Sequence, residues 1–201
     1  MIVYVESNFV LELAFLQEEH DSCDAIIMLA ETRDIELVVP AFSLAEPYEA
    51  LVRRSRQRAD LHSRLTTELR ELSRSRPYAE IAERSKEITN VLVQSMEAEK
   101  RQLDTTLARL AACAEVISMG VDILKAGMQL QMRLNLSPQD SIVYSSILAH
   151  LVSATNGPKC FLNKDAKDFV TPDIQEQLGS YQCRLITRFS DGLSYLQRPQ
   201  N

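Results

Sequence analysis

Four acidic residues stand where a predicted strand ends or a predicted helix begins: Glu6, Glu46, Asp140 and Asp165. The carboxyl ends of parallel strands meet at one edge of an open sheet, and ligands bind at that edge. Carboxylates that meet there repel one another unless a cation neutralises them. Oxygen ligands without histidine or cysteine favour Mg²⁺ or Mn²⁺ over zinc or copper. The sequence therefore predicts a divalent-metal site, with Asp168 competing with Asp165 for the fourth ligand position.

Two of these acids also have local interpretations. Glu46 ends the segment Ser43-Leu44-Ala45-Glu46, which has the form of a capping box, so its carboxylate could cap a helix instead of binding a metal. Asp140 suits the positive end of a helix dipole, although the apolar residues that follow it favour a functional role. Glu6 has few such local uses, because an acid at the end of a central strand is seldom left buried and unpaired.

The remaining polar candidates are equally open to two interpretations. Asp165 and Asp168 could serve as turn or capping residues. Ser7 and Asn8 follow the first acid, so they could orient its carboxylate or simply cap the helix that begins there.

The elements that must position these residues alternate between strand and helix. Short apolar runs predict strands at residues 2–5, 35–39, 113–119, 159–162 and 183–187. Helical patterns lie between them, at residues 9–16, 43–50, 122–134, 138–152 and from 172 onward, and the last two begin after the capping residues Ser137 and Thr171. This alternation predicts an α/β fold, with a mainly parallel central sheet covered by helices on both faces.

Residues 51–113 have a different character, because glycine is absent and apolar residues recur at helical spacing. We expect a long helical arm, made of two helices folded back on each other and joined near residues 75–77. The alternative is a coiled-coil arm for dimerisation, which would use the same apolar residues. Residues 53–76 hold eight arginines and three acids, a net charge of +5. Four of these arginines are candidates for binding RNA phosphates: Arg53, Arg54, Arg56 and Arg58. The alternative is that they form an ordinary solvated helix face.

The composition excludes several classes of protein. The 45% hydrophobic and 25% charged fractions are ordinary for a globular domain, and the net charge of −6 argues against bulk coating of nucleic acid. Four scattered cysteines and three dispersed histidines form no zinc or redox motif. No apolar run reaches the length of a membrane span, and the N-terminus lacks the pattern of an export signal, so we expect a cytoplasmic protein without membrane contact.

Four segments carry a resemblance to a known family: residues 3–8 (VYVESN), 37–46 (LVVPAFSLAE), 136–140 (LSPQD) and 161–169 (FLNKDAKDF). In this order they are similar to the motifs of the PIN-domain family of metal-dependent ribonucleases, which includes many toxins of bacterial toxin–antitoxin pairs. The resemblance implies a single PIN-like, three-layer domain over residues 1–201, with the arm at 51–113 as a long helical hairpin insertion. It further implies Mg²⁺- or Mn²⁺-dependent hydrolysis of RNA, an antitoxin-like protein inhibitor and a homodimer.

The sequence departs from this family at Glu6, where aspartate is usual, and the longer side chain would displace a bound metal. The alternative hypothesis is therefore a PIN-like scaffold with weak or no activity that binds RNA or protein. A phosphotransfer protein is disfavoured because its acceptor after the first strand would be aspartate. A Rossmann or P-loop nucleotide binder is disfavoured because none of the five glycines lies in the first strand-to-helix turn.

Overall fold

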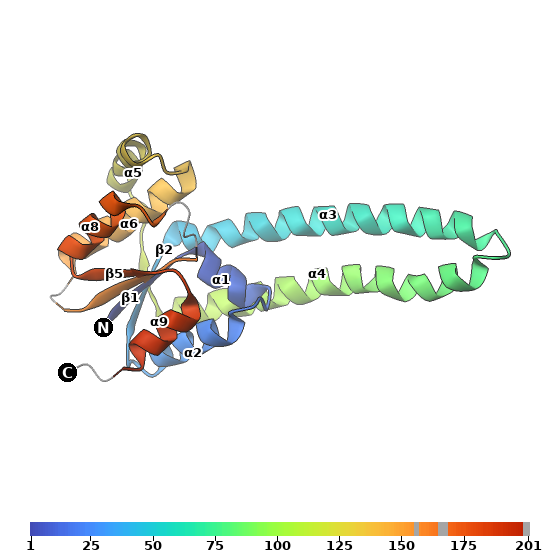
Figure 1. Ribbon diagram of the computed structural model, residues 1–201, viewed down its shortest axis with the longest axis horizontal. Helices are drawn as coiled ribbons and strands as arrows, with labels where there is room; N and C mark the ends of the chain where they lie inside the picture. Colours follow the sequence, from blue (N-terminus) through green and yellow to red (C-terminus); the bar gives the residue numbers. More distant parts are fainter. Residues whose placement is uncertain (155–156, 165–168, 199–201) are drawn as a thin grey trace.

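The computed structural model of the protein describes residues 1–154, 157–164 and 169–198. Within these residues five parallel strands form one sheet in the order β3-β2-β1-β4-β5 (Figure 1). The strands are β1 (Ile2–Val5), β2 (Glu36–Pro40), β3 (Glu115–Ile117), β4 (Lys159–Leu162) and β5 (Cys183–Ile186). The predicted α/β class and mainly parallel sheet are confirmed. Because β2 and β4 flank β1 on opposite sides, the strand order reverses beside β1, and such a point is the usual place for a ligand.

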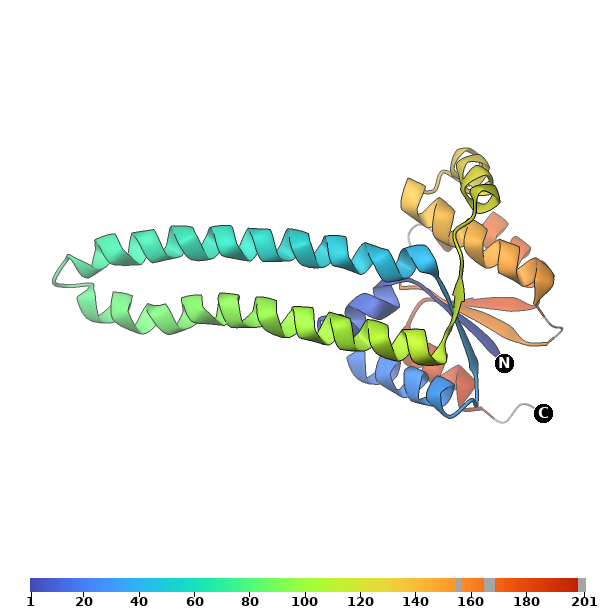
Figure 2. The ribbon, with the colours of Figure 1, turned by 180° about the vertical axis from the view of Figure 1, so that it is seen from behind.

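Helices cover both faces of the sheet and make it the middle of three layers (Figures 1 and 2). One face is covered by α1 (Ser7–Ala14), α2 (His20–Glu31), α9 (Phe189–Leu196) and the roots of the arm helices. The other face is covered by α5 (Val121–Leu134), α6 (Pro138–Ser153) and α8 (Pro172–Ser180). Alternation along β1 sends Val3 and Val5 into the first core and Ile2 and Tyr4 into the second.

The predicted helix starts are partly confirmed. Ser137 caps α6 by accepting the backbone N–H of Asp140, and Thr171 caps α8 by accepting that of Ile174. The predicted capping box is wrong, because the helix begins at Ala41 directly after β2 and Ser43 lies inside it. The sequence patterns also do not predict α2 and α9, both of which belong to the first helical layer.

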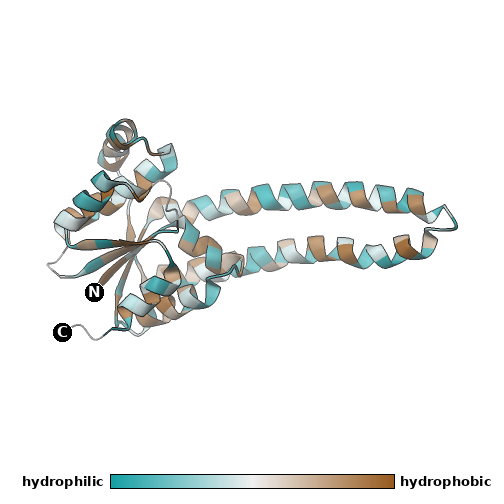
Figure 3. Ribbon diagram, viewed as in Figure 1, coloured by the Kyte–Doolittle hydropathy of each residue, from teal (hydrophilic) through white to brown (hydrophobic). Residues whose placement is uncertain are grey.

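The arm is a helical hairpin made of α3 (Ala41–Ser73) and α4 (Ala79–Cys113), which projects far beyond the sheet (Figures 1 and 2). The two predicted helices and their turn are confirmed, but α3 begins ten residues before position 51, since its first turns pack on the body. Apolar and polar residues alternate along both helices (Figure 3). The buried positions of α4 recur every three or four residues near its base, at Leu103, Thr106 and Leu110. This stripe packs within the chain against α3 and the body.

An ion cluster holds the base of the hairpin together. Glu99 accepts a hydrogen bond from Arg54 at 2.9 Å and another from Arg58 at 2.8 Å, and its side chain is only 13% exposed. The guanidinium of Arg54 also lies over the ring of Phe15, 4.2 Å from its centroid. The cluster therefore ties α3 to α4 and to the end of α1.

We expect Glu99→Gln to destabilise the protein by about 2 kcal/mol, because two half-buried guanidiniums would lose their counter-charge. The matched control is Glu80→Gln on the same helix, where the pair with Arg84 is 78% and 80% exposed and contributes little. Urea denaturation followed by circular dichroism measures both. Equal midpoints for the two variants would show that the cluster does not stabilise the hairpin.

No helix in the described part of the chain combines the length and the apolar character needed to cross a membrane.

Candidate acidic functional site

Glu6 lies at the carboxyl end of β1, the central strand, beside the point where the strand order reverses. Its side chain is buried, with 7% exposure. One carboxylate oxygen, Oε2, accepts the backbone N–H of Asn8 at 3.0 Å and so caps α1. The other, Oε1, is buried and has no hydrogen-bond partner among the described residues. The first predicted acid is therefore held in place by one oxygen and left with an unsatisfied second oxygen.

The electrostatic surroundings of Glu6 oppose its ionisation. Burial is the largest cause, and it raises the pKa of Glu6 from 4.5 to about 8 despite the hydrogen bonds from Asn8, which act in the opposite direction. The negative charges of Glu46 and Asp140 raise the pKa further. Three of the predicted acids, drawn from distant parts of the sequence, therefore lie close enough for their charges to interact.

Glu46 is held by a residue from a different helix. Its Oε2 accepts a short hydrogen bond from the hydroxyl of Ser7, which is buried in the first turn of α1. Because Ser43 is not a helix cap, the capping interpretation of Glu46 is wrong, and so is that of Ser7 and Asn8, since Glu6 caps α1 itself. The hydrogen bond instead orients the second carboxylate toward the first helix.

Asp140 is held by a contact at the start of its own helix. It stands in the first turn of α6, where its Oδ2 accepts the hydroxyl of Ser137 at 2.5 Å while its N–H donates to Ser137 Oγ at 3.1 Å. A negative charge is favourable at this end of the helix dipole. Its charge also reaches Glu6 across the sheet edge. A local capping arrangement therefore holds the third carboxylate at the common site.

These acids do not by themselves form a ready ligand cluster. Within residues 1–154, 157–164 and 169–198, no three His, Cys, Asp or Glu side chains are grouped so that they could hold a metal. Asp165 and Asp168 lie outside the described residues. Magnesium commonly keeps several waters and needs only one or two protein carboxylates besides substrate phosphates. The buried, unsatisfied Oε1 of Glu6 beside two other carboxylates fits such a partial ligand set.

The four candidate arginines fall into two pairs. Arg54 and Arg58 are bound to Glu99 inside the hairpin. Arg53 and Arg56 are exposed, and neither forms an ion pair with any described residue. Only the second pair presents free cationic groups to a ligand.

Sequence reasoning missed a second buried acid, on the helix that follows Glu6. Glu12 on α1 is 1% exposed, and its carboxylate binds Lys164 Nζ at 2.5 Å and the backbone N–H of Glu19 at 2.9 Å. Its position three residues after Phe9 places it on the core-facing side of α1, and an acid on such a face is the signal that could have found it. This ion pair links α1 to the residue that follows Asn163, which is itself buried at the end of β4.

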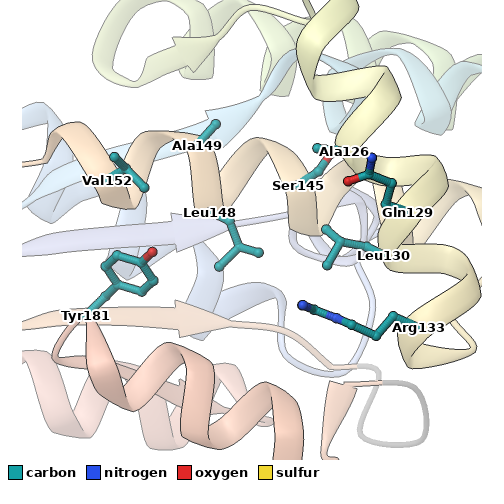
Figure 4. Close-up of a pocket in the computed structure, with 9 residues that line it drawn as sticks. All are labelled: Ala126, Gln129, Leu130, Arg133, Ser145, Leu148, Ala149, Val152 and Tyr181. Atoms are coloured by element: carbon teal, nitrogen blue, oxygen red, sulfur yellow. The ribbon is translucent and has the colours of Figure 1, made fainter.

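A separate hollow lies in the helical layer of α5, α6 and α8, between α5 and α6 (Figure 4). Its volume is about 390 Å³, and Leu130, Leu148 and Tyr181 form much of its apolar wall, with Arg133 at one end. No acid is among the described residues that line it. The hollow is therefore not part of the acidic site.

Comparisons with known proteins find one distant structural similarity. No model of a protein family matches the chain, and a search of curated proteins finds no match. A search of solved structures finds the crystal structure of VapBC2 from Rickettsia felis bound to a DNA fragment from their promoter, with a TM-score of 0.44 and 14% identity over 92% of this chain and 98% of that one. A similarity at this level assigns neither a family nor an activity.

Proposed function

We propose that the site around Glu6 hydrolyses phosphodiester bonds of RNA with the help of Mg²⁺ or Mn²⁺. The single observation that carries this proposal is the buried Oε1 of Glu6, which has no hydrogen-bond partner among the described residues and lies within the fields of Glu46 and Asp140. An ionised carboxylate is costly in such a place, and a bound cation offsets that cost. The choice of RNA rests on the four sequence segments that resemble PIN-domain ribonucleases.

The protein's own residues have distinct tasks in this proposal. Glu6 and Asp140 would hold the ion, with Glu46 beside them adding its negative charge and Asp165 or Asp168 as the predicted further ligand. When bound, the ion would polarise a phosphate oxygen and make a water molecule a better nucleophile at neutral pH. The N–H of Asn8 anchors one oxygen of Glu6, which leaves the other for the ion. The hydroxyls of Ser7 and Ser137 fix the orientation of the other two carboxylates.

Titration calorimetry with manganese chloride tests the proposal. We expect the parent protein to bind one or two ions per chain, and Asp140→Asn to weaken that binding by at least about tenfold, because one anionic ligand is removed. The matched control is Asp173→Asn, which changes an exposed acid in the first turn of α8 and should bind like the parent. Equal binding by all three proteins would contradict the assignment of the site.

A second candidate function is a PIN-like scaffold that binds RNA or protein without cutting it. The observation that favours it is the lack of a three-acid ligand group among the described residues. One oxygen of Glu6 is also already used to cap α1. The same calorimetry separates the two candidates, since the scaffold predicts no stoichiometric binding of manganese.

A further inference from the structure

The exposed root of α3 carries two arginines that nothing in the described part of the chain neutralises. Arg53 and Arg56 stand there, whereas Arg54 and Arg58, beside them in sequence, are bound to Glu99. Farther out along the arm, Arg64 pairs with Asp60 and Arg74 pairs with Glu71, both on the surface. Arg70 and Arg76 are exposed there without an ion pair to a described residue.

These two free guanidiniums are on the helix that also carries Glu46 of the acidic site. Seven residues separate Glu46 from Arg53, which is about two helical turns, so both side chains leave the same side of α3 at roughly 10 Å along its axis. Arg56 follows at roughly 15 Å and about a fifth of a turn around the helix. The two cations therefore lead away from the acidic site along one helix.

Apolar surface lies beside the two arginines. Tyr48 is 45% exposed and Val52 is 47% exposed, and both line a hollow of about 510 Å³ together with Arg53, Arg56, Glu49 and Gln57. The hydroxyl of Tyr48 donates to Asp104 of α4 at 3.4 Å, which restrains the ring while leaving much of it exposed. We call Tyr48, Val52, Arg53 and Arg56 the α3 root surface.

This combination matches the chemistry of one class of ligand. Surfaces that bind single-stranded nucleic acid combine arginines for the phosphates with an aromatic ring on which a base can stack. Guanidinium groups bind phosphate oxygens through paired hydrogen bonds. The net charge of the chain is −6, whereas residues 53–76 carry +5, so this part of the arm attracts a polyanion. At the α3 root surface two unpaired arginines also stand beside an exposed aromatic ring.

We propose that the α3 root surface binds single-stranded RNA on one side of the acidic site. At a rise of roughly 3.4 Å per stacked nucleotide, the 10 Å between Glu46 and Arg53 corresponds to about three nucleotides. Arg53 and Arg56 then hold phosphates at that distance from the bond to be cut, and one base stacks on Tyr48. The position of the cut relative to this surface rests on the proposed hydrolytic function; the binding of RNA does not.

Fluorescence anisotropy with a labelled oligouridylate of about twelve nucleotides, in the presence of a chelator, tests the surface without cleavage. We expect the double variant R53A/R56A to bind at least about tenfold more weakly, and the slope of log affinity against log salt to fall by about 1.4, since each phosphate contact on a single strand contributes about 0.7. We expect Tyr48→Ala to weaken binding at least about fivefold with an unchanged salt slope, because stacking involves no counterion release.

The matched control is R64A/R74A, which removes the same charge from the same helical arm where each arginine is paired with an acid. It should bind within about twofold of the parent. Equal weakening of both double variants would overturn the proposal in favour of general electrostatic attraction. Unchanged binding by R53A/R56A would also overturn it, and would leave an acidic protein surface as the partner of these arginines.

Two further measurements separate this inference from the proposed function. If R53A/R56A weakens binding as expected but the parent does not cut the same oligonucleotide with magnesium, the α3 root surface stands and the hydrolytic function fails. If the parent cuts RNA while R53A/R56A binds and cuts like the parent, the hydrolytic function stands and the surface fails. Tighter binding of the parent to double-stranded DNA than to the oligouridylate would overturn the assignment to a single strand.

Discussion

Asp140→Asn is expected to lower the rate of magnesium-dependent RNA cleavage by at least about a hundredfold, in line with the loss of one charged group that acts on the reacting phosphate. The change removes a negative charge and keeps the size of the side chain. The amide oxygen can still accept the hydrogen bond from Ser137 that the carboxylate accepts now, so the start of α6 should stay folded. Any loss of stability should be limited to the helix-dipole interaction, about 0.3 to 1 kcal/mol.

Cleavage of a labelled single-stranded RNA, with and without magnesium, measures this effect, and thermal unfolding of the same samples shows that the variant is folded. Asp173→Asn provides the matched control, because it makes the same chemical change in the first turn of a different helix, at an exposed position. It should cleave like the parent. A rate for Asp140→Asn within about threefold of the parent would remove Asp140 from the site.

Glu6→Gln is expected to stabilise the metal-free protein at pH values above 8. The folded-state pKa of Glu6 is raised from 4.5 to about 8, so the fold favours the protonated carboxyl. The corresponding stability is fully present below pH 4.5, is lost progressively as pH rises toward 8, and stays lost above it. Each pKa unit corresponds to about 1.4 kcal/mol, so the neutral amide should recover a few kcal/mol at high pH.

The measurement is urea denaturation of parent and variant with a chelator present, at steps of roughly one pH unit between pH 5 and 9, which cover the shifted pKa of Glu6. The difference between the two proteins isolates Glu6, because other titrating groups affect both alike. We expect the difference to be small at pH 5 and to grow with pH in favour of Glu6→Gln. Added manganese should stabilise the parent at pH 8 more than the variant, because the ion replaces the proton that Glu6 would otherwise need.

Glu12→Gln is the control, for which we expect a change in stability of the opposite sign. Glu12 is buried like Glu6, but its carboxylate is paired with Lys164 and with a backbone N–H. Its neutralisation should therefore destabilise the protein by about 2 to 3 kcal/mol, since it leaves the ammonium group without its partner. If Glu6→Gln were destabilising at pH 9 to the same extent as Glu12→Gln, Glu6 would be an ordinary satisfied carboxylate and the proposed site would lose its main support.

The local features of the fold could be predicted from the sequence because each depends on residues close together in the chain. The short apolar runs predicted the strands, and the glycine-free stretch with apolar residues at helical spacing predicted the hairpin and its turn. Ser137 and Thr171 were predicted to start helices because a cap bonds a backbone N–H only two or three residues away. The meeting of acids at one sheet edge was predicted from strand topology alone.

Which side chains bond to one another depends on residues far apart in the chain, so only the tertiary structure identified these partners. Glu46 bonds to Ser7 instead of its own helix start, and Glu99 takes two of the four candidate arginines. Glu19 binds the N-terminal groups of α9, about 170 positions later, which no local pattern could indicate. A short segment specifies its own backbone conformation, whereas burial and the pairing of charges depend on which segments the sheet brings together.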